Sequence, residues 1–249
     1  MLKKRIFVCL GLSVFFNFIL CCILFHVSFV ESDIGKKVMT YVGLSEYDSS
    51  EPRHIIEYRC LEGWANSLKK MNSNVDVVFY GNSITFGSNF HELFPECSIC
   101  NLGCNGDNLD DLIHRSFIIS SVHPRRIFIL GGINRLQDIT IEEFGDKYEL
   151  LVDTIKKQNP SSKLLLQSIL PVNTSMEVGA RYRTCQNRIV EANRIIEEIA
   201  KNKNCVYIDL YSRYQVNGSM PPQYTGDGLH LYSEAYKVWA NAISSYLRE

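Results

Sequence analysis

Short apolar runs alternate with amphipathic segments along the chain after residue 74. The run Val75–Tyr80 is mostly β-branched and aromatic and is closed by Gly81, which predicts a buried strand that leads into a turn. Similar runs follow at Ser98–Leu102, Arg126–Leu130, Lys163–Ile169 and Cys205–Leu210. Helical spacing of apolar residues predicts helices between and after these strands, over Leu109–Val122, Ile141–Gln158, Arg181–Asn202 and Ser233–Arg248.

This alternation of strands and helices predicts the fold class. Strands that are mostly apolar and separated by helices are typical of a parallel sheet with both faces covered. We therefore expect a three-layer α/β/α sandwich over residues 51–249. The sequence from Glu51 onward is also helical in pattern, and its apolar residues fall near one face of that helix: Ile55, Leu61, Trp64, Leu68 and Met71.

The N-terminal residues have a different pattern. Three basic residues, Lys3, Lys4 and Arg5, precede an uncharged stretch from Ile6 to Val30. As a helix rising about 1.5 Å per residue, this stretch is long enough to cross a hydrocarbon core of roughly 30 Å. We expect residues 1–30 to form an uncleaved signal anchor and residues 31–50 to form a linker.

The basic residues before the span predict a cytoplasmic N-terminus. The rest of the chain would then lie in the cell envelope, anchored in the cytoplasmic membrane and outside the cytoplasm. The alternative is a cleaved signal peptide with a secreted or periplasmic domain, although no convincing small-x-small cleavage site is present.

Charge argues against binding to nucleic acid, and the spacing of the cysteines argues against a metal site. The 26 basic and 27 acidic residues are interspersed, with a net charge of −1, so no basic face indicates binding to nucleic acid. Six cysteines follow the span, which permits either buried thiols or a disulfide. The cluster of Cys97, Cys100 and Cys104 lacks a fourth ligand at metal-like spacing, so we expect no metal site.

Polar and glycine residues follow the predicted strands. They are Gly81–Thr85 after the first strand, Gly103–Asp107 after the second, Gly131–Asn134 after the third, and Asp227–His230 before the last helix. In open α/β sheets, ligands bind outside the carboxyl ends of the strands. We therefore expect these four segments to form one site.

The residue types in these segments predict acyl transfer. Ser83 is a candidate nucleophile, His230 a candidate base, and Asp227 is close enough in sequence to orient the imidazole. The backbone N–H groups of Ser83 and Gly106 and the amide of Asn134 are candidate donors to the oxyanion. Taken singly, Ser83 and Asn134 are equally typical of turns, and His230 of a surface histidine.

The four segments together resemble the SGNH (GDSL) hydrolase superfamily, over about residues 75–248. The resemblance implies a flavodoxin-like sheet of five parallel strands, Ser83 as nucleophile, Gly106 and Asn134 as oxyanion donors, and Asp227 and His230 as the other triad members. Within the superfamily, the chain looks most like the bacterial branch related to platelet-activating-factor acetylhydrolases and carbohydrate acetylesterases. Thr85 replaces the second glycine of the Gly-x-Ser-x-Gly elbow, which argues against the α/β-hydrolase fold.

Two positions differ from the usual pattern of that superfamily. Asn82 replaces an aspartate beside the nucleophile, and because the amide is nearly isosteric it can keep the hydrogen bonds of the turn. Arg135 replaces an aspartate after Asn134. Arg135 is either a solvated arginine or a contact for an anionic group of the substrate.

The expected activity is hydrolysis of a short acyl ester, an acetyl group on a carbohydrate, with no metal or organic cofactor. Tyr214 and Tyr224 are candidates to flank a sugar, or else residues of the core or rim. Two other functions would use the same residues, a lipase or lysophospholipase and a glycan O-acyltransferase. A third alternative is a catalytically inactive carbohydrate-binding module, which the competent residues at every triad and oxyanion position disfavour.

Overall fold

The computed structural model describes residues 55–70 and 75–248. The predicted anchor and linker, residues 1–50, lie outside the described residues. The chain divides into two compact units, Met1–Ile56 and Glu57–Glu249, and the second contains nearly all described residues. None of the described helices is both long and apolar enough to span a membrane.

The second unit is built on one five-stranded parallel sheet with the order β2-β1-β3-β4-β5. Its strands are β1 (Val77–Gly81), β2 (Ile99–Gly103), β3 (Arg126–Leu130), β4 (Lys163–Gln167) and β5 (Val206–Ile208). All four pairings are parallel. The predicted parallel sheet is thus confirmed.

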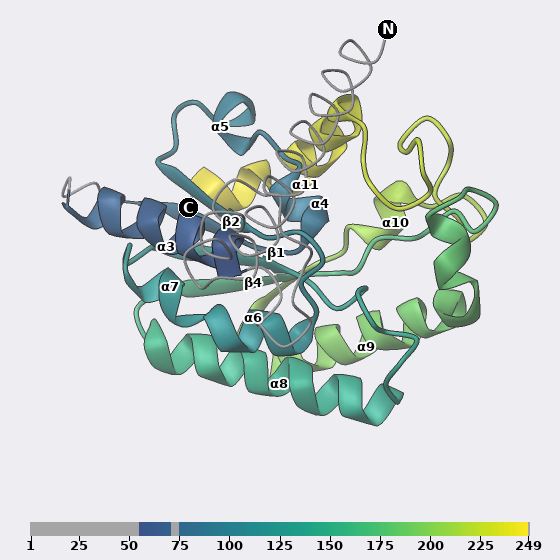
Figure 1. Cartoon of the computed structure of the whole chain (residues 1–249), viewed down its shortest axis with the longest axis horizontal. Coiled ribbons are helices and arrows are strands. Elements are labelled where there is room, and N and C mark those ends of the chain that lie inside the picture. The colour runs from purple at the N-terminus through teal and green to yellow at the C-terminus, as the bar shows by residue number, and fades with distance from the viewer. Residues whose placement is uncertain (1–54, 71–74, 249) are drawn as a thin grey trace, which may run out of the picture. The chain divides into compact units, whose positions relative to one another are not determined.

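Helices cover the two faces of this sheet (Figure 1). One face carries α6 (Leu109–Arg115), α7 (Phe117–Ser120), α8 (Ile141–Gln158) and α9 (Gln186–Asn202), and the other carries α4 (Ser83–Phe86), α5 (Phe90–Leu93) and α11 (Tyr236–Arg248). The remaining described helices are α3 (Ile55–Lys70), η1 (Gly179–Cys185), α10 (Tyr211–Tyr214) and η2 (Ser233–Ala235).

Adjacent residues of β1 face opposite layers, as the pleat of a strand requires. The Phe79 ring stacks on Phe90 of α5, with ring centroids 3.5 Å apart. The next residue, Tyr80, donates a hydrogen bond from its hydroxyl to the carbonyl of Leu112 in α6, at 2.5 Å. The side chains of Phe79 and Tyr80 are both fully buried. The near-continuous apolar character of the strand therefore reflects burial on both faces.

Several predicted boundaries differ from those of the structure, by one or two residues in β1, β2 and β5, and side chains explain two further differences. Strand β4 ends at Gln167, and not at Ile169, because the side-chain amide of Asn193 binds both the N–H and the C=O of Ile169, at 2.7 and 3.0 Å. The helix predicted over Leu109–Val122 is divided at Ser116, whose hydroxyl donates to the carbonyl of Ile113 at 2.9 Å.

Other differences concern helix α3 and the helix predicted over Arg181–Asn202. The spacing groups Trp64 with Leu61 and Leu68 near one face of α3, but the Trp64 side chain is 69% exposed, whereas both leucines are half-buried. Helix α9 begins at Gln186, because the preceding turn, Gly179–Cys185, is 3₁₀-helical. The short helices α4, α5 and α10 were not predicted, since four residues carry no detectable period.

Two glycines at the ends of β1 and β2 lie directly against other backbone segments, Gly103 against α4 and Gly81 against the end of β3. Gly81 and Gly103 are paired in register on these neighbouring strands. A Cβ atom on Gly103 would lie 2.2 Å from the backbone nitrogen of Phe86 in α4. One on Gly81 would lie 2.2 Å from the carbonyl oxygen of Leu130. Neither position can accept a side chain without a shift of the backbone.

We expect Gly103→Ala to lower the free energy of unfolding by about 3 kcal/mol, because the added methyl group overlaps backbone atoms that cannot rotate away. Urea denaturation measures this loss. The matched control is Gly63→Ala in α3, where a Cβ atom meets nothing within 4 Å. That change should stabilise by roughly 0.5–1 kcal/mol, as expected for alanine in a helix interior. Equal effects of the two substitutions would contradict the packing described here.

Candidate active site

Ser83 is held at the junction of β1 and α4. It is the first residue of α4, directly after the N-cap residue Asn82, whose Oδ1 accepts the N–H of Ile84 at 3.0 Å. Asn82 is fully buried, while Ser83 is half-buried. The asparagine therefore performs the capping role for which a short polar side chain is favoured. The cap leaves the serine hydroxyl accessible at the carboxyl end of the sheet.

The segment 225–231 places Asp227 and His230 together. Oδ1 of Asp227 accepts the backbone N–H groups of Leu229 and His230, each at 2.8 Å, which closes a tight turn. Gly228 within this turn has φ +92°, and a Cβ atom there would lie 2.4 Å from the carbonyl oxygen of Asn173. This position therefore requires glycine.

Three side chains from these two segments form a continuous chain of hydrogen bonds. Nδ1 of His230 lies 2.6 Å from Oδ2 of Asp227, and Nε2 of His230 lies 3.0 Å from Oγ of Ser83. Because a carboxylate only accepts, Nδ1 carries the proton and Nε2 is free to accept the serine hydroxyl. Such an arrangement can remove the proton of the serine during attack on a carbonyl carbon.

The carboxyl group of Asp227 is kept ionised by its hydrogen bonds. Partial burial on its own raises the pKa of Asp227. The hydrogen bonds from His230 and from the N–H groups of Leu229 and His230 outweigh this, so the pKa lies below its ordinary value of 3.8. Asp227 is therefore a carboxylate near neutral pH and can only accept the hydrogen bond from Nδ1 of His230.

The predicted oxyanion donors lie at neighbouring strand ends. Within the described residues, the backbone N–H groups of Ser83 and Gly106 have no hydrogen-bond partner. Gly106 has φ +74°, a backbone conformation that favours glycine. The Nδ2 atom of Asn134 donates one hydrogen bond, to the carbonyl of Asp107 at 2.8 Å. Its second N–H remains for another acceptor.

Asn134 is also contacted by a residue that the sequence did not indicate. The hydroxyl of Tyr182, in η1, donates to Oδ1 of Asn134 at 3.3 Å. Burial raises the pKa of Tyr182, so the hydroxyl keeps its proton. Because the Asp107 carbonyl only accepts, the two contacts determine which end of the amide is nitrogen. Tyr182 lies 48 residues from Asn134, and no local pattern identifies it.

Three residues that the sequence suggested as possible substrate contacts are Arg135, Tyr214 and Tyr224. Arg135 is exposed, and its Nε lies 3.3 Å from Oδ2 of Asp138. Tyr214 is fully buried and donates to the carbonyl of Ala235 at 2.7 Å, so it belongs to the core and does not flank a sugar. Tyr224 is half-buried, with its ring edge-on to Tyr214.

The cysteines of the described residues are not arranged as a metal site. All six cysteines that the structure describes are free thiols. Burial raises the pKa of Cys97, and raises that of Cys100 to about 11, so both remain protonated near neutral pH. Within residues 55–70 and 75–248, no group of three or more His, Cys, Asp or Glu side chains is arranged to hold a metal ion.

Solved structures with the same fold include several bacterial proteins. A Streptococcus pneumoniae protein named for platelet activating factor is 24% identical, covers 78% of this chain and 94% of its own, and has a TM-score of 0.68. A GDSL-like lipase from Bacteroides thetaiotaomicron is 22% identical, with coverage of 77% and 97% and a TM-score of 0.68. An acetyl xylan esterase from Geobacillus stearothermophilus is 17% identical, with coverage of 70% and 95% and a TM-score of 0.56.

Solved structures with 17% to 24% sequence identity show only that the fold is shared, so the family has to come from the match of the sequence to a family. No curated protein matches the chain. Residues 79–238, more than half of the 249 residues, match the GDSL-like Lipase/Acylhydrolase family. That segment includes all five residues predicted to form the site. The chain belongs to the GDSL-like lipase/acylhydrolase family and is a GDSL-type esterase.

Proposed function

We propose that the protein removes a short acyl group, an acetyl group, from a carbohydrate ester with Ser83 as nucleophile. The observation that carries this proposal is the unbroken chain from Asp227 through His230 to Ser83, with distances of 2.6 and 3.0 Å. A serine hydroxyl needs a base within hydrogen-bond reach and a partner that fixes the tautomer of that base. Both requirements are met by side chains of this unit.

The proposed reaction has two steps. Oγ of Ser83 attacks the ester carbonyl carbon while its proton passes to Nε2 of His230, and the negative charge collects on the former carbonyl oxygen. The N–H groups of Ser83, Gly106 and Asn134 are the donors for that oxygen. His230 then protonates the leaving alcohol, which gives an acyl-serine. Water loses a proton to His230 and attacks the acyl-serine, and His230 then passes that proton to Oγ as the acyl–oxygen bond breaks, which releases the carboxylic acid and free Ser83.

Two observations support an acetyl group as the acyl group and a carbohydrate as the alcohol. One protein with the same fold is an acetyl xylan esterase. The second support is the segment 1–30, which as a signal anchor or signal peptide would place the domain outside the cytoplasm. A lipase or an O-acyltransferase would use the same three side chains. These alternatives differ in acyl length and in the acceptor of the acyl group.

The test combines active-site labelling with a series of esters. A fluorophosphonate should modify one serine, and peptide mapping should assign the adduct to the peptide that contains Ser83. Hydrolysis of 4-nitrophenyl esters should fall steeply from acetyl to longer acyl chains, and acetylated xylo-oligosaccharides should release acetate. No adduct on Ser83 would contradict the nucleophile. Faster cleavage of long chains would support a lipase, and transfer to added sugars in excess over hydrolysis would support a transferase.

A further inference from the structure

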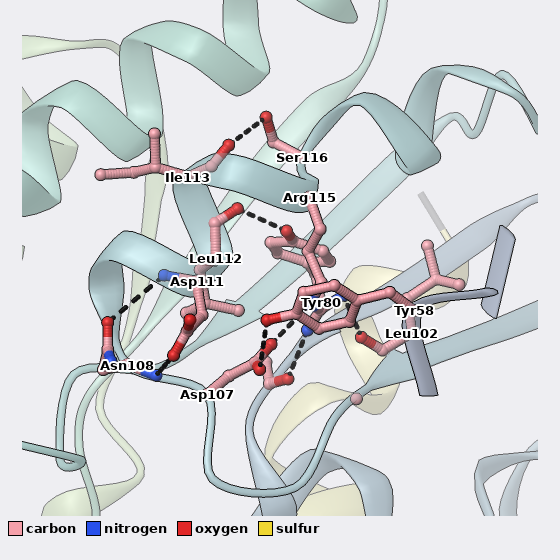
Figure 2. A network of polar contacts seen from close by, with 12 residues as sticks. Tyr58, Tyr80, Leu102, Asp107, Asn108, Asp111, Leu112, Ile113, Arg115 and Ser116 are labelled. Atoms are coloured by element: carbon pink, nitrogen blue, oxygen red, sulfur yellow. Dashed lines mark hydrogen bonds and ion pairs between the residues drawn. The ribbon is translucent and has the colours of Figure 1, made fainter. Parts of the chain in front are cut away.

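A buried ion pair that takes no part in the proposed reaction lies at the ends of β1 and β2 (Figure 2). The guanidinium of Arg115, fully buried, donates from Nε to Oδ2 of Asp107 at 2.5 Å. Its Nη1 and Nη2 donate to the carbonyls of Leu102 and Gly81, each at 2.9 Å. Arg115 therefore ties Asp107 to the last residues of two neighbouring strands.

Asp107 has a second side-chain partner and a main-chain partner. Its Oδ1 accepts the hydroxyl of Tyr58, in α3, at 3.1 Å. Its backbone carbonyl accepts Nδ2 of Asn134 at 2.8 Å. The residue before it is Gly106. Asp107 therefore connects the buried ion pair directly to two of the three proposed oxyanion donors.

The charges of this pair matter for an adjacent oxyanion. A carboxylate without a partner would repel negative charge that develops on a nearby oxygen, and low polarity would strengthen that repulsion. Burial raises the pKa of Asp107, and the Arg115 guanidinium beside it opposes this rise. Pairing with Arg115 both favours ionised Asp107 and cancels its charge.

Stability alone gives no strong reason for an ion pair at this position. Well-packed apolar residues of similar volume are often as stabilising as a buried ion pair, because desolvation offsets the attraction between the charges. An ion pair with several fixed hydrogen bonds has a different property, since it determines the position of the backbone to which it is attached. Here that backbone includes the carbonyl that Asn134 contacts.

We propose that Asp107, held by Arg115 and Tyr58, is a positioning residue that fixes the amide of Asn134 as an oxyanion donor. The proposal rests on the proposed function of Asn134 as an oxyanion donor, and it identifies the residues that hold the Asn134 amide in position. Asp107 acts through its backbone carbonyl and does not contact the substrate. Loss of the alignment should weaken stabilisation of the transition state and leave ground-state binding of the ester unchanged.

The variant Tyr58→Phe tests this role with little change to the core, because Tyr58 is only half-buried. It removes one hydrogen bond to Asp107 and keeps the ion pair. We expect kcat to fall about 5-fold with KM unchanged, as for loss of about 1 kcal/mol of alignment.

The matched control is Tyr80→Phe. The Tyr80 ring also packs on Arg115, at 4.3 Å, but its hydroxyl donates to the carbonyl of Leu112 and not to Asp107. This variant should lose stability and keep the wild-type kcat. Equal kcat in wild type and Tyr58→Phe, or an equal loss in both tyrosine variants, would overturn the positioning role.

A double-mutant cycle separates positioning from a general structural effect. In an Asn134→Ala background, the donor that Asp107 aligns is absent, so Tyr58→Phe should lower kcat by less than about 2-fold. Fully additive losses would contradict the proposal. A readout independent of turnover is the side-chain amide NMR signal of Asn134, which should shift in Tyr58→Phe and not in Tyr80→Phe. An unchanged signal overturns the positioning role, whereas an inactive wild-type protein would contradict only the proposed function.

Discussion

Ser83→Ala is expected to lower kcat for ester hydrolysis by about 10⁶-fold, the scale of loss when the nucleophile of a serine hydrolase is removed. Alanine cannot form the acyl-enzyme, and the remaining donors of the site act only on uncatalysed attack by water. The fold should be unaffected, because the cap of α4 is made by Asn82 and not by Ser83. Initial rates with 4-nitrophenyl acetate, at enzyme concentrations that detect weak turnover, measure the loss.

The control for this substitution is Ser88→Ala. Ser88 lies just after α4 and is half-buried, and its hydroxyl donates to the carbonyl of Thr85 at 2.8 Å. It has no contact with His230 among the described residues. The Ser88 variant should keep wild-type kcat and fluorophosphonate labelling. Appreciable turnover by Ser83→Ala, with the wild-type dependence on ester concentration, would reject Ser83 as nucleophile.

Asp227→Asn is expected to lower kcat by about 10⁴-fold with the geometry preserved. The asparagine amide can present its nitrogen to His230, which favours the tautomer with the proton on Nε2, and that tautomer cannot accept the proton of Ser83. The oxygen of the amide can still accept the N–H groups of Leu229 and His230, so the turn should remain. Asp209→Asn is a suitable control, because Asp209 is exposed and accepts only the N–H of Ser212 among the described residues.

The same substitution has a pH signature in stability. Folding lowers the pKa of Asp227, so the carboxylate stabilises the native state above its unfolded pKa of about 3.8, and this contribution is lost as pH falls through the folded value. The difference in Tm between wild type and Asp227→Asn should therefore be largest near neutral pH and shrink below about pH 4. A difference that grows on acidification would contradict the hydrogen-bonded carboxylate seen here.

Local sequence patterns predicted the parts of the fold that depend on local forces. Strand β3 and helix α8 have the predicted ends, because β3 is one continuous apolar run and α8 has an uninterrupted helical period. Helix α8 also starts at an N-cap, Thr140, that accepts the N–H of Glu143. The end of β4 was missed because it depends on Asn193, which is 24 residues from Ile169 in the sequence. Contacts of that range leave no periodic signal.

The site shows the same division. The strand ends and the resemblance to a family indicated Ser83, Asp227 and His230, and the structure brings these side chains within hydrogen-bond distance. Their catalytic roles remain predictions. Arg115 was overlooked although a signal exists: it lies three residues after the buried Leu112, on the apolar side of a helix, where a charged residue requires a buried partner.

The glycine pair at Gly81 and Gly103 has a consequence for sequence divergence. The backbone of α4 approaches Gly103 and the carbonyl of Leu130 approaches Gly81, and neither glycine has room for a Cβ atom. Proteins of this fold that share 22% or 24% of their residues with the chain could exchange most core side chains and keep these two backbone contacts. Evolutionary constraint should therefore concentrate on the two glycines, while neighbouring positions of the strands drift.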